Sequence, residues 1–205
     1  NDSIDIRGAV NNADADFSSS TAISTGKVSI EGSITAPDTS GVHAKADVTG
    51  DVTTKDVPKV KIPDIDFTPY FNWAQDHGEV KIGSVSINSS YAPNGGVLYV
   101  IGDVQLSGQT TFTGTIIATG NISIAGNVNV TTTDYGFAMA TESGDINNTS
   151  SGKITGLVFT ETGNYKQTSN GKLEGQILIG GDIQKGGVSD NTIYTKFVPT
   201  PPDGG

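Results

Sequence analysis

The sequence predicts an all-β protein, a single-stranded, three-sided, right-handed parallel β-helix with one short helical insertion. Three observations predict this fold. A unit of 18 to 24 residues repeats along the chain, apolar and polar residues alternate inside each unit, and glycines separate the short apolar stretches. A period of this length without a helical pattern is typical of a solenoid, in which stacked coils share one core.

The repeat is clearest in residues 96–108 and 114–126, which align when the sequence is shifted by 18 positions. Its anchor is an apolar stretch followed by Gly, then Asp or Asn, then an apolar or aromatic residue. The anchor returns at 144–146, 163–165 and 181–183, and in weaker form at 8–10, 26–28 and 50–52. Eight coils spaced by about 4.8 Å predict a rod of roughly 40 Å.

The alternation inside a unit has a period of two residues, as in a strand with one buried face. Val104 and Leu106 point one way, and so do Ile122 and Ile124 in the next unit, with polar residues between them. A left-handed hexapeptide solenoid needs an aliphatic residue every six positions. Here the apolar positions come in pairs two apart, which favours the right-handed type.

Four segments follow from this pattern. Residues 1–62 form N-terminal coils, 63–96 an insertion, 97–198 the main coils and 199–205 a disordered tail. Within the insertion we expect a short helix over about 69–77, since Thr68 can cap it, Pro69 suits its first turn and Gly78 can end it.

Composition excludes several classes of function. The 205 residues carry a net charge of −10 and a single Arg, so the basic patch needed for nucleic acid is missing. There is no Cys for a disulfide or a thiolate site. The chain contains no apolar run of membrane-spanning length, and it opens in mid-pattern at Asn1. We therefore expect membrane attachment only through a segment ahead of Asn1.

Several stretches resemble a known family. Residues 63–67 (PDIDF), 70–75 (YFNWAQ) and 94–104 (NGGVLYVIGDV) look like the C-terminal region of bacterial pilus-assembly proteins that begin with a prepilin-like membrane helix. Residues 114–122 and 171–183 are similar to the same group. The coil pattern also resembles, more distantly, that of bactofilins, which are polymer-forming β-helices. The resemblance implies a β-helix with a pilus-associated or envelope role.

A series of polar residues follows the corner glycines and is predicted to stack in one column. It consists of Asp103, Asn121, Asp145, Asn164 and Asp182, with Asp51 as an extension. Asn and Asp in turns bond to backbone N–H groups, so we interpret the series as a structural ladder. The alternative is a carboxylate-rich groove for Ca²⁺. We predict no cofactor, because neither Asp14 and Asp16 nor Asp64 and Asp66 matches an EF-hand loop or the nonapeptide of calcium-binding β-rolls.

The aromatic residues Tyr70, Phe71 and Trp73 form the densest apolar group with Phe67. They are predicted to be the inner face of the helix, and the alternative is a partner surface or sugar platform. No nucleophile motif or metal site is present, and the five Glu residues look scattered over the repeat. We therefore predict no enzymatic activity, with a carbohydrate-active β-helix as the alternative.

The predicted function is a non-enzymatic, structural β-solenoid on the bacterial surface, outside the cell or in the periplasm. It would act as a rigid scaffold or adhesion module, with pilus or envelope proteins as partners. Two alternatives stay open. One is a module that binds a glycan or another partner, and the other is a bactofilin-like scaffold that associates with itself.

Overall fold

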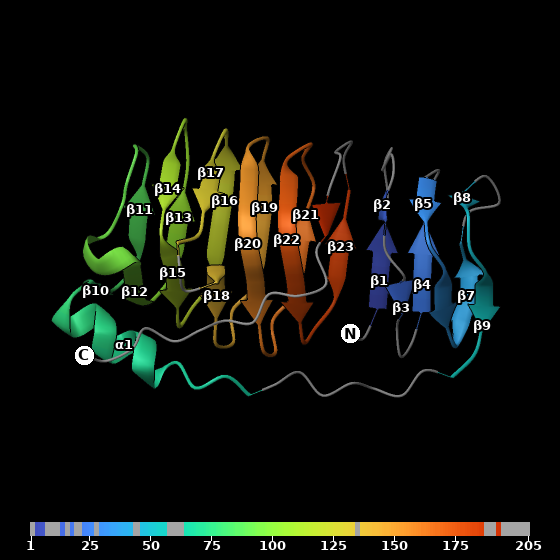
Figure 1. Cartoon of the computed structure of the whole chain (residues 1–205), viewed down its shortest axis with the longest axis horizontal. Coiled ribbons are helices and arrows are strands. Elements are labelled where there is room, and N and C mark those ends of the chain that lie inside the picture. The colour runs from blue at the N-terminus through green and yellow to red at the C-terminus, as the bar shows by residue number, and fades with distance from the viewer. Residues whose placement is uncertain are drawn as a thin grey trace.

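The computed structural model is a parallel β-solenoid of about 8 turns with one α-helix (Figure 1). It describes residues 3–6, 13–14, 17–18, 22–26, 29–42, 46–56, 64–133, 136–186 and 192–193. Strands make up 54% of the chain and helix 8%. The predicted parallel β-helix with one helical segment is therefore confirmed, and its right-handed sense stays a prediction.

The first face of the solenoid is one sheet of nine strands that pair in parallel. In spatial order its strands are β11 (Val85–Ile87), β13 (Val104–Leu106), β16 (Ile122–Gly126), β19 (Ile146–Ser150), β21 (Tyr165–Gln167), β23 (Ile183–Lys185), β1 (Ser3–Ile6), β4 (Ala22–Thr25) and β7 (Asp38–Gly41).

The second and third faces complete each coil. The second face holds β14 (Thr111–Thr113), β17 (Asn129–Thr131), the first halves of β20 (Lys153–Thr160) and β22 (Lys172–Ile179), β24 (Thr192–Ile193), β2 (Ala13–Asp14), β5 (Ser29–Glu31) and β8 (Asp47–Val48). The third face holds β10 (Glu79–Ile82), β12 (Val97–Ile101), β15 (Thr115–Ala118), β18 (Phe137–Thr141), the second halves of β20 and β22, β3 (Phe17–Ser18), β6 (Ile34–Ala36) and β9 (Val52–Thr54).

The order of coils along the rod differs from their order in the sequence. The coils of β1 to β9 do not precede β10 in space, because β1 pairs with β23 near the C-terminal end of the chain. The chain thus starts in the middle of the rod and builds three coils outward to β9. It then crosses back to the helix and builds the other coils toward β1 (Figure 1).

The central strands of the third face are buried on both sides, which explains their largely apolar sequence. The burial alternates in β13, where only the middle residue is exposed, but the first four residues of β12 and all residues of β15 and β18 are buried. Leu98 and Val100 point into the solenoid core, whereas Val97 and Tyr99 belong to a second apolar cluster outside it. A strand covered on both faces needs no polar residues for solvent.

The single helix, α1 (Thr68–Asp76), covers this outer surface. Its buried residues are Tyr70 and Ala74, which pack in the second cluster with Phe67. The predicted helix is confirmed in place, although Thr68 lies inside it and does not cap it. Phe67 is the N-cap residue, and no side chain caps the first turn. The backbone N–H of Thr68 instead donates to Asp66 at 2.9 Å.

Two expectations about the segments need correction. The insertion expected over 63–96 is shorter, because β10 and β11 already pair with β12 and β13 as the first coil of their block. Asp51 does not extend the predicted ladder, because it precedes β9 on the third face, whereas Asp103 precedes β13 on the first. The expected tail 199–205 lies outside the described residues.

A further short element, the 3₁₀-helix η1 (Asn94–Gly96), leads into β12, and Tyr91 forms an isolated parallel bridge with Phe112.

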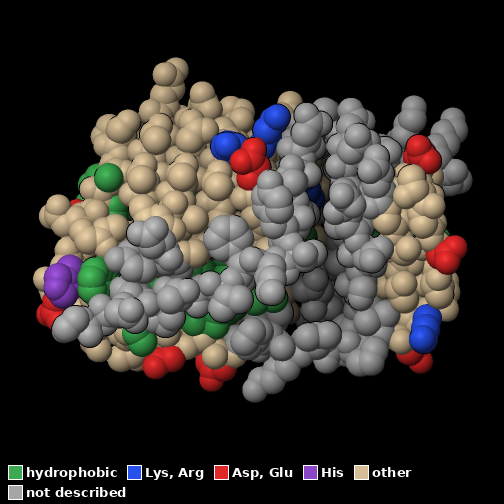
Figure 2. Space-filling view, viewed as in Figure 1, with side chains coloured by type: hydrophobic (Ala, Val, Ile, Leu, Met, Phe, Trp, Pro, Cys, Tyr) green, Lys and Arg blue, Asp and Glu red, His purple; other side chains and the backbone are tan. Residues whose placement is uncertain are grey.

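Figure 2 shows apolar side chains gathered in the region of α1, while most of the other visible described surface is polar. No described helix has the length and apolar character needed to cross a membrane.

Candidate functional site

One corner of the solenoid carries a column of glycines. A side chain at any of them would enter the coil beneath: a Cβ on Gly120 would lie 2.9 Å from the carbonyl oxygen of Gly102, and one on Gly163 would lie 1.9 Å from that of Gly144. Gly181 follows in the column, and its N–H donates to Gly163 at 3.0 Å. The repeated Gly is thus required by the close approach of successive backbones.

The Asp and Asn residues that follow these glycines are brought together in a continuous hydrogen-bond ladder. Each side-chain oxygen accepts the backbone N–H of the equivalent residue one coil further on. The four bonds run from Asn121 to Asp103 (2.8 Å), from Asp145 to Asn121 (2.9 Å), from Asn164 to Asp145 (2.8 Å) and from Asp182 to Asn164 (2.8 Å).

The alternation of Asp with Asn also serves the ladder electrostatically. The amide nitrogen of Asn164 donates to the carboxylate of Asp145 at 3.0 Å, so neighbouring side chains attract each other. An unbroken run of Asp would instead place like charges one coil apart. Among the described residues, no group of three or more His, Cys, Asp or Glu side chains is arranged to hold a metal ion.

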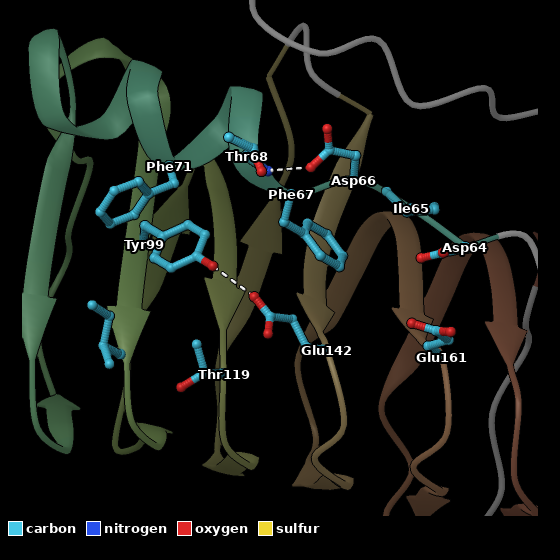
Figure 3. A pocket seen from close by; sticks show the side chains of 11 residues that line it. Asp64, Ile65, Asp66, Phe67, Thr68, Phe71, Tyr99, Thr119, Glu142 and Glu161 are labelled. Atoms are coloured by element: carbon cyan, nitrogen blue, oxygen red, sulfur yellow. Dashed lines mark hydrogen bonds between the residues drawn. The ribbon is translucent and has the colours of Figure 1, made fainter.

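A groove of about 680 Å³ opens on the third face, between the strand ends and the segment that leads into α1 (Figure 3). Its lining residues are Asp64, Ile65, Asp66, Phe67, Thr68, Phe71, Tyr99, Ile101, Thr119, Glu142 and Glu161. Asp64 to Phe67 enter from the crossing segment, Thr68 and Phe71 belong to α1, and the glutamates come from the corners after β18 and β20. The groove is open to solvent along one side.

The aromatic wall of the groove is fixed by contacts on both sides. The rings of Phe71 and Tyr99 meet edge to face, with centroids 5.1 Å apart. The Tyr99 hydroxyl donates to Glu142 at 2.7 Å, as Figure 3 shows. Burial and the neighbouring carboxylate both raise the pKa of Tyr99, burial more strongly, so its hydroxyl remains a donor at all physiological pH values.

The groove is strongly acidic. Four of its lining residues are Asp or Glu, and none of the lining residues is Lys or Arg. The pKa of Asp66 is lowered by its hydrogen bonds from Thr68, so this carboxylate is ionised at neutral pH. Carboxylates beside an aromatic wall can accept hydrogen bonds from hydroxyl groups or attract a cation placed against the ring faces.

The three aromatic residues of the predicted partner surface take different positions. Tyr70 is only 1% exposed and packs edge to face on Phe137, so it cannot contact a partner in this structure. Phe71 lines the groove and is half-buried. Trp73 is also half-buried, stacks on His77 and donates from its indole nitrogen to Gly95 at 2.9 Å.

Sequence reasoning missed Glu142 and Glu161, which had looked scattered. The signal was present, because both follow a Thr at a strand end and precede a Gly by two residues. Both threonines, Thr141 and Thr160, act alike, since each donates to the carbonyl of a corner glycine in the coil beneath. The two glutamates are therefore equivalent positions of neighbouring coils.

No protein-family model and no curated protein matches the chain.

Proposed function

We propose that this chain is a non-enzymatic structural β-solenoid, a rigid scaffold of the bacterial cell envelope associated with a pilus or another surface assembly. The observation that carries the proposal is the continuity of the stack: nine strands on one face pair in parallel as a single sheet, and the Asp and Asn ladder ties five successive corners together. Such a body resists bending because this one sheet joins each described coil to the next.

The surface chemistry also supports a place outside the cytoplasm. Charged residues make up 17% of the chain, below the roughly 25% of average soluble domains, and Ser, Thr, Asn and Gly cover much of the surface instead. With a net charge of −10 the molecule repels other acidic surfaces at long range. An uncharged polar surface and a net negative charge would both suit a spacer that must stay extended.

A cysteine-accessibility experiment tests the location. These 205 residues contain no Cys, so Thr53→Cys, introduced into the full reading frame, adds one exposed thiol on β9, and labelling is compared with that of the unmodified protein. We expect a membrane-impermeant maleimide to label this variant on intact bacteria. An Ile116→Cys variant, whose position is fully buried, is the matched control and should stay unlabelled until the protein is denatured. Labelling of Thr53→Cys only after cell lysis would contradict the proposal.

The acidic groove favours a second candidate function, the binding of a glycan. Phe71 and Tyr99 supply ring faces, and Glu142 and Glu161 supply acceptors for sugar hydroxyls. A glycan array with the purified protein tests this candidate. Binding that is lost in Glu161→Gln and kept in Glu174→Gln, an exposed carboxylate paired with Lys153 outside the groove, would support it. Absence of binding to any glycan would reject it.

A further inference from the structure

The junction between β23 and β1 joins two parts of the chain that are far apart in sequence. Three residue pairs define its register: Ile4 with Ile183, Asp5 with Gln184, and Ile6 with Lys185. The pairing is parallel and in phase with that of the coils on either side. On the first face the hydrogen-bond pattern therefore continues across a break in chain continuity, whereas among the described strands of the other two faces β2, β5 and β8 and β3, β6 and β9 form sheets of their own.

Each side of this junction has apolar packing of its own. The coils of β4 to β9 contain a cluster of Ile23, Ile30, Ile34 and Ala36. The coils from β11 to β23 contain the large central cluster, whose members run from Ile87 to Ile179. The break in chain continuity between β23 and β1 divides the coils into two blocks, here named the N-block (β1 to β9) and the main block (β10 to β24).

The interior of the main block becomes polar as it approaches the junction. On the first face the inward column begins with Ile87, Leu106 and Ile124, and it continues with Asn148, Gln167 and Lys185, all of which are buried. Burial lowers the pKa of Lys185 to about 8, a sign that the ammonium group is poorly solvated there. Apolar burial, the main driving force for stacking, is thus weaker near this junction than in the coils before it.

We propose that the N-block of one chain can dock on the β23 edge of a second copy of the same chain, so that the protein assembles head to tail by exchange of its N-block. Every chain carries one donor edge at β1 and one acceptor edge at β23, and the exchanged contact has the register already seen within one chain. A contact between two different surfaces of identical subunits gives a ring if its rotation closes and an open fibre if it does not. Because the β23–β1 pairing continues the parallel stack along the rod axis, repeating it between chains generates a linear fibre.

The length of the crossing segment decides between the two arrangements. Lys55 is bonded to Ala36 at the end of the N-block, and the ring of Phe67 packs on Phe137 of β18 and Phe159 of β20. Within one chain these anchors are about five to six coil spacings apart, or roughly 24 to 29 Å. The twelve residue steps between them reach at most about 43 Å. The segment closes within one chain with limited slack.

A linear fibre needs less length. In the fibre, the N-block of a chain lies next to the main block of the same chain, with β9 beside β10, as the order of the sequence alone would place it. The same two anchors are then about four to five spacings apart, or roughly 19 to 24 Å. Deleting residues 58–63 leaves six steps, which reach about 20 to 22 Å. This length reaches the shorter part of the range that the exchanged arrangement needs, and it falls short of the roughly 24 to 29 Å that the closed arrangement needs.

The test compares this deletion with a chain in which residues 58–63 are replaced by six Gly and Ser residues. Both carry Asp5→Cys and Gln184→Cys, which are paired across the junction in a protein without other thiols. After treatment with a short bis-maleimide, we expect the deletion variant to give a ladder of cross-linked multimers and elongated particles in light scattering. The length-matched variant should stay monomeric with an intramolecular cross-link. A folded, monomeric deletion variant would overturn the proposal.

A second measurement covers a deletion variant that does not fold. Two full-length chains, one with Asp5→Cys and one with Gln184→Cys and a size tag, are unfolded in urea and refolded together at high concentration. Docking between chains predicts a cross-linked heterodimer, and its yield should rise with protein concentration. A mixture that refolds to native circular dichroism without any heterodimer would equally overturn the proposal.

Discussion

An alanine at position 163 would place a methyl group against the backbone of the preceding coil. The added Cβ would lie 1.9 Å from the carbonyl oxygen of Gly144, whereas an ordinary contact needs at least about 3.4 Å. The two coils would have to separate at this corner by roughly 1.5 Å. The predicted effect of Gly163→Ala is therefore a loss of contacts between coils and not a change in backbone preference.

The magnitude follows from the bonds at that corner. Separation would weaken the bond from the Thr160 hydroxyl to Gly144 (3.0 Å) and the two bonds from Asn164 to Asp145 (2.8 and 3.0 Å). At about 1 kcal/mol each, their loss lowers the free energy of unfolding by about 3 kcal/mol. For a chain of this length, that corresponds to a fall in Tm of about 6 to 12 °C.

The assay is thermal and urea unfolding followed by circular dichroism. Gly83→Ala is the matched control, because Gly83 stands at the open end of the same column and an added Cβ meets nothing within 4 Å. Its cost comes only from its positive φ of 89° and should be about 1 kcal/mol. If Gly163→Ala were no less stable than Gly83→Ala, the stacking argument would be refuted.

Three further predictions concern polar groups. Because the folded pKa of Lys185 is about 8 and its unfolded value is 10.5, the unfolded state binds more protons between these values, so the free energy of unfolding should rise by about 2 kcal/mol from pH 7 to 9.5. Urea titrations should show this rise in the wild type, and a rise of equal size in Lys185→Met would contradict the assignment. Asn121→Asp should destabilise the ladder by about 1 kcal/mol at low salt, since it puts three carboxylates in adjacent coils, and 1 M NaCl should remove most of this loss. Stability independent of salt would argue against like-charge repulsion. Tyr99→Phe removes the hydroxyl bonded to Glu142 and should lower the free energy of unfolding by about 1 kcal/mol, whereas Tyr99→Phe combined with Glu142→Gln should cost little more than Tyr99→Phe alone. Additive losses in this double-mutant cycle would show that the bond contributes nothing.

The sequence predicts the fold because the repeat is a direct consequence of stacking. Gly102 and Gly120 recur since a Cβ at these positions meets the preceding backbone, and Asp103 and Asn121 recur since each side chain bonds the next coil. Both constraints act at fixed positions in successive coils, from Gly102-Asp103 to Gly181-Asp182. Because the same requirement selects the same residue type in each coil, the repeat is visible in the sequence alone.

The spatial order of the coils could not be predicted in this way. A stack with β9 beside β10 and a stack with β1 beside β23 satisfy the same local patterns, because each strand edge offers the same backbone groups. The choice depends on where the crossing segment and α1 pack. The crossing segment and α1 pack on the outer surface of the third face. In the sequence, this surface is indicated only by the apolar residues of β12 and β15.

The repeat pattern also failed to predict which face of the solenoid each N-block strand belongs to. The triplet at 50–52 matches the anchor in residue type, but Asp51 directly precedes β9, a strand of the third face. With coils this short, one Gly-Asp corner looks like another in sequence. The groove was missed for a related reason, since Asp64 and Glu142 come from elements that meet only in three dimensions.

The most direct test of the account is a distance between spin labels at Thr53 and Lys81, both exposed and both on the third face. In the observed coil order, β9 and β10 stand at opposite ends of the rod, about nine spacings apart, and we expect a distance centred at roughly 43 Å. A single population below about 15 Å in the monomer would place β9 beside β10, in the order of the sequence. That result would contradict the coil order on which the two-block description rests.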